Sequence, residues 1–398
     1  MSDHHFDELQ DTVQTQGIER ALEQLIATLK EEKKYHELFD ALLLRKRHAL
    51  GLALVQKGTL GDLPEEKRRA LEDEYVDCCR TVGDLYLSEG DLAHAWVYLR
   101  TIDETAKVTD ALDRLDPAEQ RGDREQLIDV ALHQGAHPRK GYELLLKSYG
   151  TCNAVTAMDQ VLGRISPADR TACVGMLVRQ IYGDLVESLR ADVAHRGPEH
   201  GEQAVESRES LPQNVTELIA GRDWLFGEHS YHVDASHLAA GVRFSRELPP
   251  GADLDRAIEL TEYGRRLAPM FQYKSDPPFD KFYEDHGVYL RALRGENVDE
   301  AVAHFEQKLQ QADDDAKPMC AAVLVTLLDR LGKSGDAISI ALAHLSHVQD
   351  AGGGFPTIAE LAHRAGEYQG LIEFARQKGD LVSFVAGLIE ERVDGSSK

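Results

Sequence analysis

The fold is decided by the stretch GDLYLSEGDLAHAWVYL, which spans residues 83–99. Its apolar residues recur at helical spacing on both sides of Gly90, so the pattern predicts two helices joined by a tight turn. Gly83 and Ala95 are small residues at positions where two crossing helices touch, and Leu99 is the large residue that fills the next hole. We therefore predict a helical hairpin with a close helix crossing.

The same pattern returns later in the chain. A second copy runs from Phe282 through residues 295–301 to Phe305, with one extra residue in its turn. Weaker copies surround residues 331–337 and 363–368. A supersecondary unit that recurs in this way is typical of a repeat protein, because each hairpin must cover its apolar stripe with a neighbour.

These copies resemble the tetratricopeptide repeat family. The resemblance implies a right-handed superhelical stack of helix–turn–helix hairpins, in which the first helices line a concave surface that binds peptide or protein segments. It does not imply catalysis. The regular period of that family fails between about Pro138 and Pro212, where the helices look longer, so we expect the stack to be irregular in the middle.

Outside the repeats, helical signals also dominate, and the sequence predicts an all-α fold. We find no sustained period-two run that would indicate a strand. The prolines fall where helices should begin or end, and residues 166–169 and 357–360 carry the chemistry of helix N-termini. We expect one helical-hairpin array over residues 1–195 and a second over 214–398, with the boundary in the connection Arg196–Gln213.

Charge and hydropathy narrow the classes of partner. The chain of 398 residues has 45 Lys and Arg against 69 Asp and Glu, which gives a formal net charge of −24. Because such a surface repels phosphate groups, we expect neither nucleic acid nor a membrane as partner. The mean hydropathy is −0.39, and no apolar run approaches about 20 residues. The charge favours solubility; the alternatives are a basic partner or a saline environment.

The cysteines and the first residues predict a cytoplasmic protein. No two cysteines have the Cys-x-x-Cys spacing, which fits reduced thiols. Residues 1–7 have neither the basic region nor the apolar stretch of a secretory signal. The cysteines are Cys78, Cys79, Cys152, Cys173 and Cys320.

One segment, residues 224–238, is rich in groups that ligate metals or exchange protons. It contains three of the 17 histidines and two acidic residues within ten positions. Imidazole and carboxylate groups both bind divalent metals such as zinc. The candidate metal ligands are His229, His232, Asp234 and His237, with Glu228 as an alternative carboxylate.

The spacing of these residues limits such a site. His229 and His232, or Asp234 and His237, are three residues apart and can supply two ligands from one helix face. A complete site needs a helix that begins near Tyr231 with His229 on the preceding loop, or ligands from another helix. We predict that this segment faces the concave surface and forms the functional centre.

A second interpretation of the same segment is structural. The histidines are then polar groove or packing residues beside the core stripe of one helix. This stripe consists of Tyr231, Ala235, Leu238 and Val242.

Two functions from different classes follow. The first is a non-catalytic interaction scaffold that binds a peptide or protein partner in its groove. The second is a metal-binding protein or metal-dependent enzyme centred on residues 229–237. A purely structural subunit of a larger assembly is a third. No phosphate-binding loop, nucleophile elbow or zinc-finger spacing is present, which favours the scaffold over an enzyme.

Overall fold

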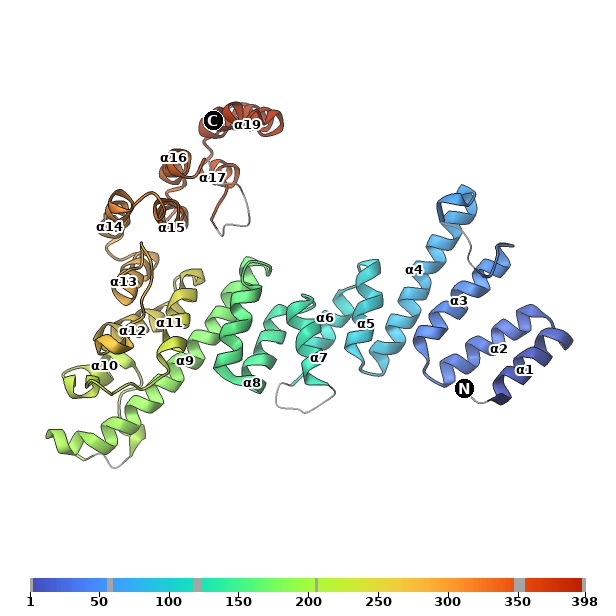
Figure 1. The fold of residues 1–398 in the computed structure, drawn as a ribbon, viewed down its shortest axis with the longest axis horizontal. Coiled ribbons are helices and arrows are strands. Elements are labelled where there is room, and N and C mark those ends of the chain that lie inside the picture. Colours follow the sequence, from blue (N-terminus) through green and yellow to red (C-terminus); the bar gives the residue numbers. More distant parts are fainter. Residues whose placement is uncertain (1–2, 56–59, 117–122, 205–206, 347–354, 396–398) are drawn as a thin grey trace. The chain divides into compact units, whose positions relative to one another are not determined.

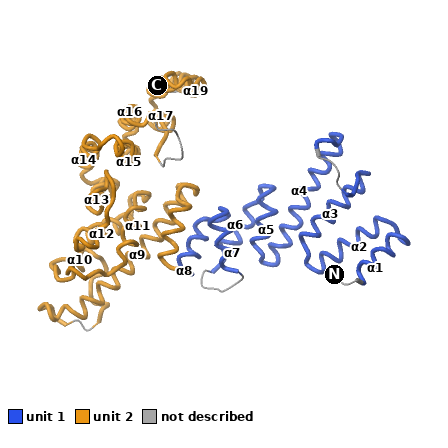
Figure 2. Tube along the Cα trace, in the orientation of Figure 1, with its two compact units in different colours: residues 1–148 blue, residues 149–398 orange. Residues whose placement is uncertain are grey.

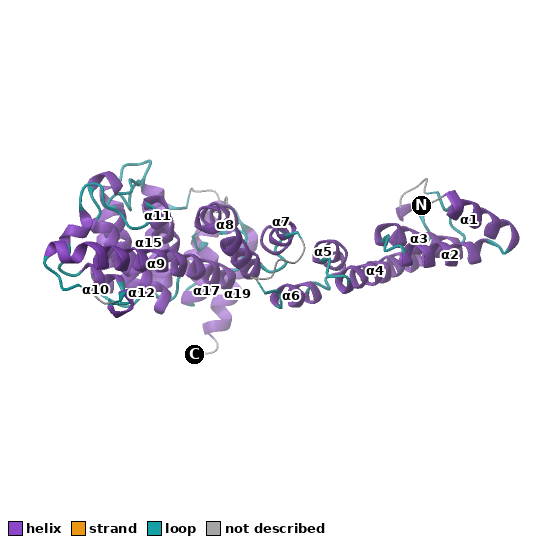
Figure 3. Cartoon of the chain, turned by 90° about the horizontal axis from the view of Figure 1, so that it is seen from below, coloured by secondary structure: helices purple, strands orange, loops and turns teal. Residues whose placement is uncertain are grey.

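Helices dominate the described structure. The computed structural model describes residues 3–55, 60–116, 123–204, 207–346 and 355–395. It is 76% helical, and no strand occurs in these ranges (Figure 1, Figure 3). The predicted all-α fold is therefore confirmed. Among the helices that the structure describes, none combines the length and the apolarity that a membrane span needs.

The chain divides into two compact units, residues 1–148 and 149–398 (Figure 2). Within each unit, most helices contact the helix that follows them in the sequence. The division into arrays over 1–195 and 214–398, whose boundary lies later in the chain than that between the two units, stays a prediction.

Unit 1 contains the helices up to the middle of α8. They are α1 (Asp3–Thr15), α2 (Ile18–Glu31), α3 (Tyr35–Ala49), α4 (Glu65–Ser88), α5 (Leu92–Leu99), α6 (Ala106–Asp113), α7 (Arg124–Ile128) and α8 (Pro138–Val161), with 3₁₀ turns η1 (Leu60–Asp62) and η2 (Arg100–Ile102) and a π-helical turn η3 (Asp129–His133).

Unit 2 begins at Tyr149, one residue before the interruption of α8 at Gly150, whose φ of 74° and ψ of −176° are not helical. Its helices are α9 (Pro167–Arg196), α10 (Val215–Ile219), α11 (Ala235–Phe244), α12 (Ala252–Arg266), α13 (Phe282–Leu293), α14 (Val298–Gln311), α15 (Lys317–Arg330), α16 (Ser334–His344), α17 (Ile358–Ala365), α18 (Gln369–Lys378) and α19 (Leu381–Gly395). Short 3₁₀ turns join them: η4 (Gly197–His200), η5 (Arg208–Ser210), η6 (Asp223–Phe226), η7 (Ser245–Glu247) and η8 (Pro269–Phe271).

The predicted helix starts are confirmed in their hydrogen bonds. The hydroxyl of Ser166 accepts the backbone N–H of Asp169 at 3.1 Å at the start of α9. At the start of α17, the Thr357 hydroxyl accepts the Glu360 N–H at 3.2 Å, and the Thr357 N–H donates to the Glu360 carboxylate at 2.8 Å. These bonds satisfy backbone groups that a helix N-terminus leaves free.

Residues 83–99 form the predicted hairpin of α4 and α5. Gly90 adopts a φ of 80° in the turn, where a β-carbon would be strained. Asp91 then caps α5 by accepting the N–H of His94 at 3.1 Å. Ala95 and Leu99 are completely buried, and Trp96 packs into a core that α5 shares with α6 and η3. The predicted hairpin is therefore confirmed.

The second copy forms the hairpin of α13 and α14. Its longer turn uses two left-handed residues, Gly295 with φ of 93° and Asn297 with φ of 50°. Ala301 and Phe305 of α14 are buried, as the pattern predicts. The weaker copies are the pairs α15–α16 and α17–α18, whose turns contain Gly332 and Gly366, each with a positive φ.

The middle of the chain departs from the short hairpins, as expected. Helix α9 is 30 residues long and packs against α10, α11 and α12 within unit 2. The connection Arg196–Gln213 contains η4 and η5, and residues 205–206 of it lie outside the described residues.

Candidate functional site

The histidine-rich segment is not one helix. After η6 the chain runs as a loop, and α11 begins only at Ala235. His229 lies exposed in this loop. Asp234 is the N-cap of α11, where its carboxylate accepts the backbone N–H groups of Ser236 at 2.8 Å and His237 at 3.2 Å. Asp234 therefore stabilises a helix start.

His232 is held by two helices of unit 2. Its side chain is only 5% exposed, and its Nε2 lies 2.8 Å from the carboxylate of Asp192 on α9. Its Nδ1 lies 3.0 Å from the hydroxyl of Tyr263 on α12, which also accepts the His232 backbone N–H at 2.9 Å. Because a carboxylate only accepts, Nε2 carries the proton and the Tyr263 hydroxyl donates to Nδ1. Both ring nitrogens are thus occupied.

The protonation of this pair follows from its burial and partners. Burial lowers the pKa of His232, although Asp192 acts in the opposite direction. Burial also acts to raise the pKa of Asp192, but hydrogen bonds from Arg196 and His232 outweigh it and leave that pKa below its ordinary value. A neutral imidazole between a carboxylate and a phenol has hydrogen-bond partners for both of its ring nitrogens. The arrangement ties the loop to α9 and α12.

The predicted core stripe is half right. Leu238 and Val242 are completely buried, but Tyr231 is 56% exposed and packs against Phe271, so its assignment to the core was wrong. Tyr231 precedes the helix, and helical spacing therefore does not govern where its side chain lies.

Within the described ranges, no group of three or more His, Cys, Asp or Glu side chains is arranged to hold a metal ion. The structure therefore adds no support for metal ligation by the predicted set. That set is His229, His232, Asp234 and His237.

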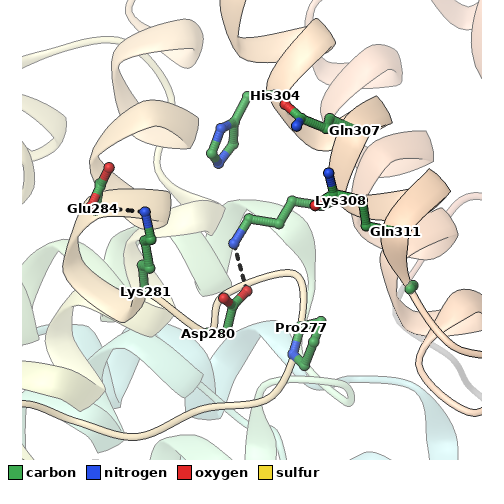
Figure 4. A pocket seen from close by; sticks show the side chains of 9 residues that line it. Pro277, Asp280, Lys281, Glu284, His304, Gln307, Lys308 and Gln311 are labelled. Atoms are coloured by element: carbon green, nitrogen blue, oxygen red, sulfur yellow. Dashed lines mark hydrogen bonds and ion pairs between the residues drawn. The ribbon is translucent and has the colours of Figure 1, made fainter.

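A polar cavity of about 500 Å³ lies on the α13–α14 hairpin (Figure 4). Side chains from the start of α13 and from one face of α14 point toward it. We call it the α13–α14 cavity. It is lined by Pro277, Asp280, Lys281, Glu284, His304, Gln307, Lys308, Gln311 and Ala312.

Asp285, which is completely buried, is the polar anchor beside this cavity. Its carboxylate accepts the backbone N–H of Lys281 at 2.9 Å and the ammonium of Lys308 at 3.1 Å, and it lies 2.8 Å from Nε2 of His304. Lys308 also donates to Asp280 at 2.5 Å. A buried carboxylate is costly unless it is paired in this way.

The charges around the α13–α14 cavity mostly pair with one another. Burial acts to lower the pKa of Lys308, but hydrogen bonds to Asp280 and Asp285 raise it above its ordinary value. The lining includes no Ser, Thr or Cys that His304 could activate as a nucleophile. The geometry therefore suits a polar network that joins α13 to α14 better than covalent catalysis.

A second cavity, of about 650 Å³, lies on unit 1 between α3 and α4. Most of its lining is apolar, and three of its apolar side chains are more than a third exposed: Leu54 (38% exposed), Tyr75 (42%) and Val76 (37%). We call it the α3–α4 cavity. It is lined by Asp40, Leu43, Leu44, Arg47, Leu54, Leu71, Glu72, Tyr75 and Val76.

Aromatic side chains extend this surface toward the start of α3. Phe39 contacts Tyr75 edge to face, with ring centroids 5.3 Å apart, and it lies at the same distance from Tyr98. The hydroxyl of Tyr98 is 2.6 Å from Nδ1 of His36, and Tyr86 lies tilted against the same imidazole at 5.5 Å. An apolar cavity with an adjoining aromatic surface is a common form of binding site.

Neither cavity was predicted from the sequence. The α3–α4 cavity had a signal, because Leu43 and Leu44 extend beyond the single stripe that one hairpin needs. The α13–α14 cavity had a weaker signal in the four-residue spacing of His304 and Lys308, while Asp285 gave no sign that it would be buried.

Comparisons with known proteins leave the geometry as the only guide. No protein-family model, curated protein or solved structure matches this chain. The resemblance to tetratricopeptide repeats therefore rests on the residues of this chain alone.

Proposed function

We propose that the protein is a non-catalytic interaction scaffold that binds a segment of a partner protein at the α3–α4 cavity. The main support for this proposal is that Leu54, Tyr75 and Val76 remain partly exposed around an apolar cavity. Burial of an anchoring Leu or Phe side chain there is worth about 1.5–3 kcal/mol. Such an anchor is the usual centre of an energetically important contact.

The repeat pattern supports a more detailed proposal about how the hairpins are arranged. We propose that the hairpins stack as tetratricopeptide-like repeats in a right-handed superhelix and that the protein works in the cytoplasm. A reducing compartment fits its five cysteines, which are all free thiols. The alternative of a metal-dependent protein has no observation in its favour within the described residues.

Site-specific photo-crosslinking tests the proposal. A photoreactive amino acid at position 76, on the rim of the cavity, is expected to form adducts with a partner in cells of the native host. The same residue at position 97 is the matched control, because Val97 is similarly exposed (43%) but lies on α5 and does not line the cavity. Equal adduct formation at the two positions, or none at position 76, would overturn the proposal.

A further inference from the structure

We propose that the occupant of the α3–α4 cavity is a basic amphipathic helix. Its aliphatic side chains enter the cavity, and its lysines or arginines face Asp40 and Glu72. This inference rests on the proposed function and adds the chemistry of the partner.

The length of the surface suits a short helix. His36, Asp40, Leu43 and Arg47 recur on one face of α3 at spacings of four, three and four residues. At 1.5 Å per residue, this face extends for about 16 Å, or about three turns. A partner helix that lies along it can place side chains from successive turns against the aromatic surface and the cavity.

The carboxylates of the lining favour a cationic partner. Asp40 and Glu72 are exposed, and neither forms an ion pair or hydrogen bond with another described residue. The nearby Glu74, in contrast, pairs with Lys46 at 3.2 Å. Arg47, the one basic residue of the lining, donates its Nε–H to the carbonyl of Ala53 at 2.9 Å. Two carboxylates thus remain available for a partner.

Aromatic side chains beside the cavity fit the same chemistry. Tyr75 lines the cavity and is about half exposed, and Phe39 packs against its ring. A lysine or arginine over the face of such a ring is attracted by its π electrons. Asp40 and Tyr75 line the same cavity, so one partner helix can contact both a carboxylate and an aromatic ring.

Charge argues against a second copy of this chain as the occupant. Helix α19 carries a stripe of exposed aliphatic side chains, and Glu390 and Glu391 lie on the same helix outside this stripe. Docking of α19 from another copy would bring together two chains that each carry a net charge of −24 and therefore repel each other. The aliphatic residues of this stripe are Leu381, Val382, Val385, Leu388, Ile389 and Val393.

Two synthetic peptides test the inference by fluorescence anisotropy with the full chain. Each is an amphipathic helix about 14 residues long with leucine at helical spacing; one carries lysine on its polar face and the other glutamate. We expect the lysine peptide to bind and the glutamate peptide to bind at least about tenfold more weakly.

Matched variants locate the binding. We expect Val76→Asp to weaken the lysine peptide about tenfold or more, and the control Val97→Asp to leave its affinity within about twofold. The double variant Asp40→Lys/Glu72→Lys should also weaken it, whereas Glu66→Lys/Asp73→Lys, which changes the net charge equally at exposed sites outside the lining, should not. Circular dichroism checks that each variant is folded.

Each other outcome overturns the inference. If the glutamate peptide binds more tightly than the lysine peptide, and Val76→Asp abolishes this binding, the cavity is a docking site but its occupant is not basic. Self-association in sedimentation velocity that Val76→Asp abolishes would identify a second copy. If the lysine peptide fails to bind, or binds equally to all variants, the basic occupant is rejected. Continued cross-linking at position 76 would then preserve the proposed function, and its absence would reject both.

Discussion

Leu99 on α5 occupies the space beside Gly83 on α4 so closely that a β-carbon at position 83 would lie 2.6 Å from its Cγ. Both residues are buried, and Leu99 is completely so. The sequence pattern pairs Gly83 with Ala95, but the nearest side-chain atoms belong to Leu99, one turn later. The close helix crossing therefore depends on the absence of a side chain at position 83.

Replacing Gly83 with alanine is expected to lower the free energy of unfolding of unit 1 by about 1–3 kcal/mol, because the added methyl group overpacks the crossing. Urea unfolding followed by the fluorescence of Trp96, in a Trp224→Phe background, measures this. The control is Gly183→Ala on α9, followed by circular dichroism because α9 belongs to unit 2; there the added β-carbon meets nothing within 4 Å and helix propensity should improve by up to about 1 kcal/mol. Equal stability of the Gly83→Ala and parent proteins would refute the packing described.

Ala95→Leu should also destabilise unit 1, by about 1–3 kcal/mol, since Ala95 has no exposed surface and its neighbours must move to admit a larger side chain. The thermal midpoint of the Trp96 fluorescence transition reports the change. Val97→Leu, on the exposed face of the same helix, serves as the control and should leave the midpoint within about 1 °C. A midpoint that Ala95→Leu does not lower would show that the repeat register is misassigned.

His232 and His229 should differ sharply when each is replaced by alanine. His232→Ala removes the partner of Asp192 and Tyr263 and should cost about 1–3 kcal/mol, whereas the exposed His229→Ala should change stability by less than about 0.5 kcal/mol. Urea unfolding followed by circular dichroism measures both. Metal analysis of the untagged protein accompanies it, and stoichiometric zinc that both variants lose would instead support the predicted metal site.

Because His286 is buried, we expect the folded protein to lose stability in mild acid. Burial lowers its pKa to about 3, and the charge of Arg246 adds to this effect. An unfolded histidine has a pKa near 6.5, so the unfolded state binds the proton first and stability falls as the pH drops below about 6.5. The loss from this group is about 2 kcal/mol at pH 5.

Urea unfolding of the parent and of His286→Phe at pH 7.5 and pH 5 measures this contribution. We expect the variant to lose less stability between the two pH values than the parent does. The His229→Ala variant, which removes an exposed histidine, should keep the full pH dependence of the parent. An equal pH dependence in His286→Phe and the parent would show that His286 titrates normally in the folded protein.

Local sequence determined the helices, their hairpins and several of their ends. The turn at Gly90, the cap at Ser166 and the capping box at Thr357 depend on residues no more than a few positions apart. Such interactions are encoded by spacing along one segment, and the sequence predicts them because they do not require knowledge of distant neighbours.

Only the tertiary structure decided which polar residues are buried and which surfaces stay open. Asp192 and His232 are 40 residues apart, and Asp285 and Lys308 are 23 apart, so their pairing depends on how helices pack. The density of histidines in the segment 224–238 predicted a metal site. Composition could not show that His232 already has hydrogen-bond partners on two other helices. Likewise, the α3–α4 cavity exists because Leu43 and Tyr75 lie on facing helices that leave space between them, a result of packing that spacing along the chain does not contain.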